Sequence, residues 1–250
     1  MNILVTGCDG FIGKNLCIAL DECNKFNVYR VNRYTSEKDL LSFLSKADFV
    51  FHLAGENRPE DDFEFHKGNV DYTNYITNSL EKFGRKVPIV LSSTIQIKNN
   101  NLYGKTKLAA EKSIELYSKT TGSLYYIFRF PNIFGKWCRP NYNSFIATFC
   151  YNMANGLDIS VHDPNAKVNL VYIDDVCKSF IEVLENKPKS GLMEISNVYC
   201  STVGQVAEII STFKESKDKL IIQRVGTGLT RALYSTYLSY FSSDNFSYNI

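Results

Sequence analysis

The fold of this chain is decided by its N-terminal stretch Asn2-Ile-Leu-Val-Thr6-Gly7-Cys-Asp-Gly10-Phe-Ile-Gly13. The short apolar run before Gly7 is typical of a buried strand. Gly7 permits a tight turn, Gly10 lets a pyrophosphate approach the backbone, and Gly13 lets the next helix pack close to the sheet. Glycines in this strand–turn–helix setting predict a dinucleotide site, with phosphates on the free N–H groups of the helix N-terminus.

Strands and helices alternate through the N-terminal half. We expect strands at 27–32, 48–53, 88–92 and 124–130, and helices at 11–23, 36–45, 64–83 and 102–121. This order predicts βαβ units and a Rossmann-type α/β fold, a doubly wound parallel sheet with both faces covered. Only the fourteen residues 34–47 join the second strand to the third. Because that length holds one crossover helix and nothing more, we expect a trimmed version of the fold.

The sequence after Phe130 becomes aromatic and rich in turns. We expect a helix at 144–155, a strand at 168–172 and helices at 174–186 and 202–213. These elements predict a small C-terminal substrate lobe interleaved with the sheet. Residues 1–130 plus 168–186 would form the dinucleotide-binding core, and residues 131–167 plus 187–250 the substrate-binding lobe.

Composition excludes several classes of protein. The 250 residues are 44% hydrophobic and 22% charged, which is ordinary for a globular protein. A net charge of +2 with scattered cations makes neither nucleic acid nor a membrane an expected partner. No apolar run approaches the ~20 residues of a membrane span, and a strand starts at Asn2, so we expect no signal peptide and a cytoplasmic location. The seven cysteines and three histidines lack the spacings of disulfides or metal sites, so no metal is expected.

The expected fourth strand ends at Ser92-Ser93-Thr94, and Tyr103-Gly-Lys-Thr-Lys107 follows on a helix. The four-residue spacing places Tyr103 and Lys107 on one helical face. A nearby ammonium is expected to lower the pKa of the phenol from about 10, and the Thr94 hydroxyl can polarise the same carbonyl. Tyr-x-x-x-Lys is common by chance, but its place after the strand end favours a proton donor aimed at a carbonyl oxygen that receives hydride.

The second expected strand ends at Asn32-Arg33 and favours NADP(H) as the cofactor. An NAD site places an acidic residue here to hold the ribose 2′-hydroxyl, and none occurs between Phe26 and Ser36. Arg33 would instead pair with a 2′-phosphate. The alternative is a solvated surface arginine.

These motifs resemble the extended short-chain dehydrogenase/reductase family. The resemblance rests on the glycine motif, His52-Leu-Ala-Gly55, Asn69, Ser93-Thr94, Tyr103-x-x-x-Lys107 and Arg129-Phe-Pro-Asn132. Within that family, residues 52–60, 134–144 and 233–240 are similar to the N-terminal reductase domain of CapF-type capsular polysaccharide enzymes. Thr94 stands where many relatives have serine, and it keeps the hydroxyl.

The resemblance implies NADPH-dependent reduction of the C4 ketone of a UDP-linked 6-deoxy-N-acetylhexosamine ketosugar, in the synthesis of L-FucNAc-type capsule or O-antigen precursors. It also implies a C-terminal cupin that epimerises C3 with a bound metal. The sequence stops at Ile250, so we expect this chain to lack that half. A homodimer and a separate cupin epimerase chain are the protein partners left open.

The resemblance and the motifs together assign the site residues. Catalysis is expected from Thr94, Tyr103 and Lys107. Cofactor binding is expected from Gly7, Gly10, Phe11, Ile12, Gly13, Arg33, Leu53, Ala54, Gly55, Ser92, Tyr103, Lys107 and Pro131. Substrate binding is expected from Thr94, Asn132, Arg139 and Arg231; for Asn132 a turn residue, and for the two arginines a surface cation, are equally good interpretations.

Two alternative functions stay open. A UDP-sugar 4-epimerase would retain NAD, which Arg33 argues against. A non-catalytic NADP-binding subunit of a split reductase/epimerase would have no need of Thr94, Tyr103 and Lys107. A 4,6-dehydratase is disfavoured, because Ile95 and Gln96 stand where its acid/base carboxylates would be.

Overall fold

The computed structural model describes residues 1–214 and 224–241, and the chain divides into two compact units. Unit 1 comprises Met1–Pro131 and Cys177–Ser196, and unit 2 comprises Asn132–Val176 and Asn197–Ile250. This division differs from the expected boundaries in three places: Pro131 and 187–196 belong to unit 1, and 168–176 belongs to unit 2. Residues 215–223 and 242–250, which the expected substrate lobe included, lie outside the described residues.

Unit 1 is built on a six-stranded sheet in the order β2-β1-β3-β4-β5-β8. Its strands are β1 (Asn2–Thr6), β2 (Asn27–Val31), β3 (Phe49–His52), β4 (Ile89–Thr94), β5 (Tyr125–Phe130) and β8 (Gly191–Met193). All five pairings are parallel, which confirms the expected Rossmann-type fold. The trimmed connection is confirmed as well, because α2 (Glu37–Lys46) is the helix between β2 and β3, and β2 is an edge strand.

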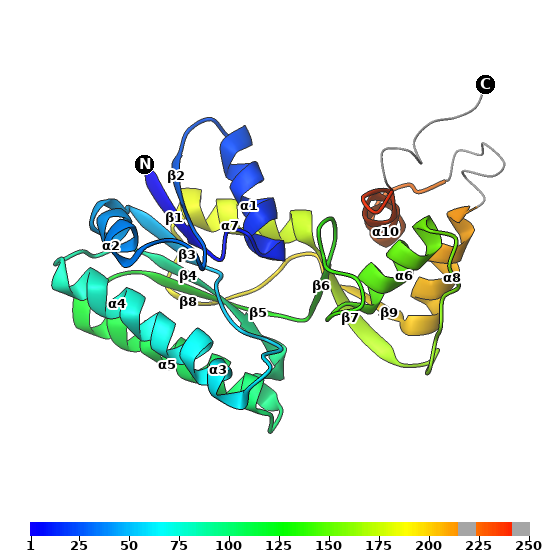
Figure 1. Ribbon diagram of the computed structural model, residues 1–250. Coiled ribbons are helices and arrows are strands. Elements are labelled where there is room, and N and C mark those ends of the chain that lie inside the picture. The colour runs from blue at the N-terminus through cyan, green and yellow to red at the C-terminus, as the bar shows by residue number, and fades with distance from the viewer. Residues whose placement is uncertain (215–223, 242–250) are drawn as a thin grey trace. The chain divides into compact units, whose positions relative to one another are not determined.

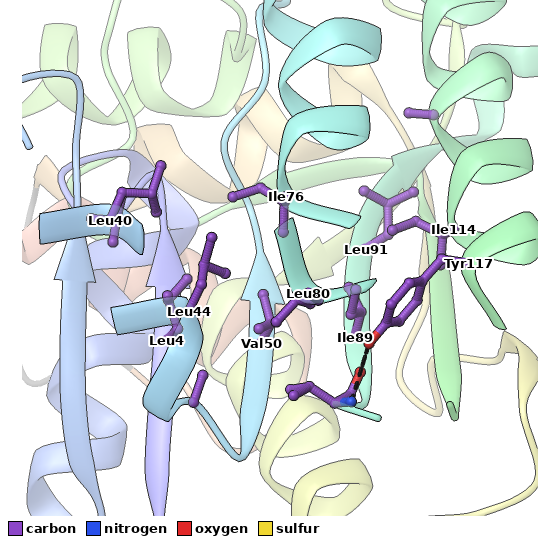
Figure 2. Packing of buried hydrophobic residues seen from close by; sticks show 14 of the residues in the cluster. Leu4, Leu40, Leu44, Val50, Ile76, Leu80, Ile89, Leu91, Ile114 and Tyr117 are labelled. Carbon is purple, nitrogen blue, oxygen red and sulfur yellow. Dashed lines mark hydrogen bonds between the residues drawn. The ribbon is translucent and has the colours of Figure 1, made fainter. Parts of the chain in front are cut away.

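Helices cover both faces of this sheet (Figure 1). Helix α1 (Phe11–Glu22) and the unit 1 part of α7 (Ile173–Asn186) lie on one face; α2, α4 (Tyr72–Lys82) and α5 (Leu102–Thr121) lie on the other. Figure 2 shows the second layer, in which leucines of α2, Ile76 and Leu80 of α4, and Ile114 and Tyr117 of α5 pack on the strands. Side chains alternate along a strand, so Phe51 and Phe128 point to the opposite face and contact Phe180 of α7.

The expected helix at 64–83 is formed in three contiguous pieces. Helix α3 (Asp62–His66) continues into the π-helical turn η1 (Lys67–Asp71) and then into α4. Asn69 of η1 is buried. Single π turns inside helices are frequent at functional sites, so Asn69 is a candidate residue of the functional site.

Unit 2 contains a three-stranded sheet in the order β6-β7-β9. Strand β6 (Asn132–Phe134) pairs in parallel with β7 (Lys167–Tyr172), and β9 (Tyr199–Thr202) pairs antiparallel with β7. The strand expected at 168–172 therefore does not join the main sheet, because β8 takes the place beside β5. Among the described residues of the unit, α6 (Phe145–Ala154), α8 (Val203–Thr212) and α10 (Leu229–Leu238) are helices that contribute to its core.

Within the described ranges, no helix is both long enough and apolar enough to cross a membrane.

Candidate active site

The glycine-rich turn between β1 and α1 fits a pyrophosphate. Gly7 has a φ of +68°, and a Cβ on it would lie 2.8 Å from the Ala54 nitrogen. A Cβ on Gly13 would lie 2.1 Å from the Gly7 carbonyl oxygen, so only glycine lets α1 start this close to the turn. Gly10 is the N-cap of α1, and no side chain caps the helix. The first N–H groups of α1 and the positive end of its dipole are therefore available to an anion.

A buried hydrogen-bond chain holds the loop after β3 against this turn. The Thr6 hydroxyl accepts from the backbone N–H groups of Leu53 and Ala54, both at 3.1 Å. With both lone pairs used, its proton points to Nδ1 of His52 at 2.8 Å. Nε2–H of His52 then donates to the Thr73 hydroxyl at 2.9 Å. Burial, and secondarily the charge of Lys107, lowers the pKa of His52 to about 3, so the ring is a neutral connector.

Asn69 of η1 fixes the same loop from the other side. Its Oδ1 accepts from the Glu56 N–H at 3.0 Å, and its Nδ2 donates to the Glu56 carbonyl at 2.8 Å. Nδ2 also lies 3.2 Å from the Thr106 hydroxyl on α5. A Cβ on Gly55 would lie 2.7 Å from Asn69 Oδ1 and 3.4 Å from Lys107 Nζ. Glycine thus fits at position 55 because the loop passes close to the buried, hydrogen-bonded Asn69; this reason could not be obtained from the sequence.

The first turn of α5 is anchored to the segment that follows β4. Asn101 caps the helix by accepting from the Gly104 N–H at 2.7 Å. A Cβ on Gly104 would lie 2.3 Å from the Gln96 carbonyl oxygen, so the helix packs tightly on the 3₁₀ turn η2 (Ile95–Lys98). Thr94 is buried and accepts from the Gln96 N–H at 3.2 Å. These contacts hold the segment after Thr94 against the turn that carries Tyr103.

The electrostatics of the Tyr103–Lys107 pair differ from the expectation in one respect. Lys107 is only 5% exposed, and burial lowers its pKa to about 8 while Glu111 opposes that fall. Burial raises the pKa of Tyr103. The expectation that Lys107 lowers the pKa of this phenol is therefore wrong for this structure, because desolvation of the phenolate dominates. Tyr103 is consequently protonated at neutral pH, the state that a proton donor needs.

Two residues directly follow β2: Asn32, which contacts an acid, and the cation Arg33. Arg33 is exposed there. Asn32 donates through Nδ2 to the Asp9 carboxylate at 2.8 Å and accepts the Tyr34 N–H at 2.9 Å. The sequence places no acid between Phe26 and Ser36, yet the fold supplies one from the glycine-rich turn. In the sequence, this acid could have been found from the position of Asp9 directly before Gly10.

The remaining expected residues fall into two groups. Phe11 and Ile12 begin α1, and Ser92 is buried on β4; Pro131 is the last residue of the first segment of unit 1. Asn132, Arg139 and Arg231 all belong to unit 2. Asn132 lies 3.5 Å from the Asn169 carbonyl, and the Arg139 guanidinium lies 5.1 Å from the centre of the Tyr142 ring. Their role in substrate binding stays a prediction.

Comparison with known families decides the affiliation of the chain. Residues 3–198 match the model of the NAD dependent epimerase/dehydratase family. The chain belongs to this family. Its members' nicotinamide dinucleotide agrees with the fit of the glycine-rich turn to a pyrophosphate, and the resemblance to extended short-chain dehydrogenases is confirmed.

Individual relatives show which members of the family this chain is similar to. Over 251 aligned residues the chain is 43% identical to the UDP-2-acetamido-2,6-beta-L-arabino-hexul-4-ose reductase of Pseudomonas aeruginosa, covering 100% of this chain and 68% of that protein. The structure of the capsular polysaccharide assembling protein CapF from Staphylococcus aureus matches with a TM-score of 0.90 and 42% identity, covering 100% of this chain and 68% of CapF. A UDP-glucuronic acid 4-epimerase from Bacillus cereus has a TM-score of 0.82 but 19% identity, with 96% of this chain and 98% of the epimerase covered, so it shows the fold alone.

Proposed function

We propose that this chain reduces the C4 ketone of a UDP-linked 6-deoxy-N-acetylhexosamine ketosugar, with NADPH as the reductant, in the synthesis of L-FucNAc-type capsule or O-antigen precursors. The observation that carries the proposal is the 43% identity, along the whole of this chain, to a protein named as a reductase of a UDP-linked hexul-4-ose. The geometry of α5 supports it, since Tyr103 is protonated and lies one helical turn from the buried Lys107.

The residues of unit 1 divide the chemistry among them. A nicotinamide dinucleotide held by the glycine-rich turn and the 53–55 loop would supply the hydride for C4. Tyr103 donates its phenolic proton to the C4 oxygen, so that ketone, hydride and proton together make the alcohol. The Thr94 hydroxyl hydrogen-bonds the same oxygen, and the Lys107 ammonium stabilises the phenolate that remains until a solvent proton replaces the lost one.

Recognition of the two nucleotides is assigned to different units. In unit 1, the glycine-rich turn and the 53–55 loop hold the dinucleotide, and Arg33 pairs with the 2′-phosphate of NADPH. In unit 2, Asn132, Arg139 and Arg231 hold the UDP-sugar. We place the reaction in the cytoplasm, with a homodimer and a separate cupin epimerase as the partners to be tested.

The test is incubation of the full chain with a UDP-linked 4-keto-6-deoxy-N-acetylhexosamine and NADPH. We expect NADPH absorbance to fall, and mass spectrometry to detect one alcohol, two hydrogens heavier than the ketosugar, for each NADPH consumed. UDP-N-acetylglucosamine, which has no ketone, is the matched negative substrate. Tight NADPH binding without reduction of any C4 ketosugar would refute the proposal and favour the non-catalytic subunit.

A UDP-sugar 4-epimerase is the second candidate, and the Asp9 carboxylate that contacts Asn32 after β2 favours it, because an acid there suits the free ribose 2′-hydroxyl of NAD. An epimerase would interconvert C4 epimers of a UDP-hexose with NAD and without net change in NADH. Formation of such an epimer in place of the reduced 6-deoxy sugar would decide for this alternative.

A further inference from the structure

A buried carboxylate that the proposed chemistry does not use lies one helical turn beyond Lys107. Tyr103, Lys107 and Glu111 follow one another at four-residue spacing on α5, so they share one face of the helix. Glu111 is 1% exposed. A carboxylate so completely removed from water is expensive unless charge and hydrogen bonds compensate it, so its position needs a reason.

Two strands of the main sheet hold this carboxylate. Ser93 of β4 donates its hydroxyl proton to Oε1. Arg129 of β5 approaches with Nε at 3.0 Å from Oε1 and with a terminal guanidinium nitrogen at 2.6 Å from Oε2. Ser93 and Arg129 are register partners on adjacent strands, so their side chains leave the same face of the sheet. Through these hydrogen bonds, Glu111 connects α5 to the carboxyl ends of β4 and β5, next to Thr94.

The surroundings of Lys107 make the charge of Glu111 matter. From β3 the titratable neighbour is His52, which is neutral because burial lowers its pKa to about 3. Gly55 of the loop after β3 and Asn69 of η1 are uncharged, and Tyr103 on α5 itself is protonated. Arg129 of β5 is bound to Glu111, with 31% of its side chain exposed. Among the described residues, Glu111 is the acid whose charge acts on Lys107 and raises its pKa against the effect of burial.

We propose that Glu111 is a positioning residue for the Tyr103–Lys107 pair: its carboxylate, held by Ser93 and Arg129, supplies the negative charge that keeps the buried Lys107 protonated. The relevance of this charge to catalysis rests on the proposed function. The effect of Glu111 on the protonation of Lys107 does not depend on the proposed function, and it can be measured without any substrate.

The test compares two variants that break the same ion pair. Glu111→Gln removes the negative charge and keeps an oxygen for the Ser93 hydroxyl; Arg129→Gln breaks the pair but leaves the carboxylate. Lysine side chains of the full-length protein, labelled with carbon-13, are titrated by NMR, and the Lys107 signal is assigned by its loss in Lys107→Arg. We expect the Lys107 midpoint to fall by about one pH unit in Glu111→Gln, a roughly tenfold lower ratio of ammonium to amine at a given pH. It should not fall in Arg129→Gln.

Two further variants separate charge from packing. Glu115→Gln removes an acid one turn further along α5 and should leave the Lys107 midpoint unchanged. Glu111→Asp keeps the charge and should restore most of the midpoint that Glu111→Gln loses. An unchanged Lys107 midpoint in Glu111→Gln, or an equal fall in Arg129→Gln, would refute the proposal and show that the ion pair between Glu111 and Arg129 has only a structural role.

The design also holds if Glu111→Gln does not fold. In that case a fall of the Lys107 midpoint in Arg129→Gln overturns the proposal by itself, because that variant retains the carboxylate. Failure of the ketosugar assay with the wild-type chain, alongside the expected Lys107 shifts, would refute the proposed function and leave the role of Glu111 standing.

Discussion

Replacing Lys107 with methionine should stabilise the fold while abolishing turnover. Lys107 is 5% exposed, and burial lowers its pKa from 10.5 to about 8. That difference of about 2.5 pH units, at about 1.4 kcal/mol each, is roughly 3 kcal/mol by which the fold disfavours the ammonium. Methionine has a similar length and no charge, and Ser93 and Arg129 still satisfy Glu111. We therefore expect Lys107→Met to raise the free energy of unfolding at neutral pH by about 3 kcal/mol.

The sign of the pH dependence follows from the direction of the shift. Because the pKa in the folded state is lowered, the unfolded chain binds more protons between about pH 8 and about pH 10.5, and folding becomes more favourable as pH rises through that window. Below about pH 8 the whole cost is present. The advantage of Lys107→Met over the wild type should be complete at neutral pH and should shrink toward zero as pH approaches about 10.5.

Urea unfolding of wild type and variant at neutral pH and near pH 10 measures both quantities. Lys105→Met is the matched control, since Lys105 lies exposed on the same helix; its effect should stay within about 0.5 kcal/mol. If Lys107→Met is less stable than the wild type at neutral pH, the ammonium stabilises the fold, and the reasoning from its burial is refuted. The same variant should lose ketosugar reduction.

The other predictions concern single side chains. Tyr103→Phe should lower turnover by about 10²–10⁴-fold with little change in dinucleotide affinity; near-wild-type turnover would rule out Tyr103 as the general acid. Arg33→Ala should weaken NADPH binding in calorimetry and leave NADH binding nearly unchanged, whereas equal losses would indicate a packing role. Asp9→Asn keeps an oxygen for the Asn32 amide and removes the charge, so NADPH should gain several-fold in affinity relative to NADH; an unchanged ratio would place Asp9 outside the ribose site. Burial lowers the pKa of His52 to about 3, so nitrogen-15 NMR should find the ring neutral down to about pH 5, and a midpoint near its ordinary value would contradict the buried chain.

The features that were predictable from sequence are those encoded by neighbouring residues. The glycine spacing between Gly7 and Gly13 specifies a turn and a helix start. The four-residue step from Tyr103 to Lys107 specifies a shared helical face. The fourteen-residue link at 34–47 limits the crossover to one helix, and α2 is that helix.

Short elements in the second half could not be predicted in the same way. Strands β8 and β9 span Gly191–Met193 and Tyr199–Thr202, too few residues for a clear periodicity. Strand β8 exists because it pairs with β5, and β9 because it pairs with β7. Helix α10 buries Ala232, Leu233 and Tyr237 in the core of unit 2. The sequence of the helix does not reveal which part of the chain it packs against.

The sequence by itself therefore determined the fold class and the glycine-rich turn, and it predicted Thr94, Tyr103 and Lys107 as the candidate catalytic set, because each depends on spacing within one or two adjacent elements. Only the tertiary structure decided what surrounds them. It brought Glu111 to Ser93 and Arg129 and Asp9 to Asn32, and it raised rather than lowered the pKa of Tyr103. The physical reason is that charge, desolvation and hydrogen bonding act through space. The separation of two residues along the chain does not show whether they are in contact.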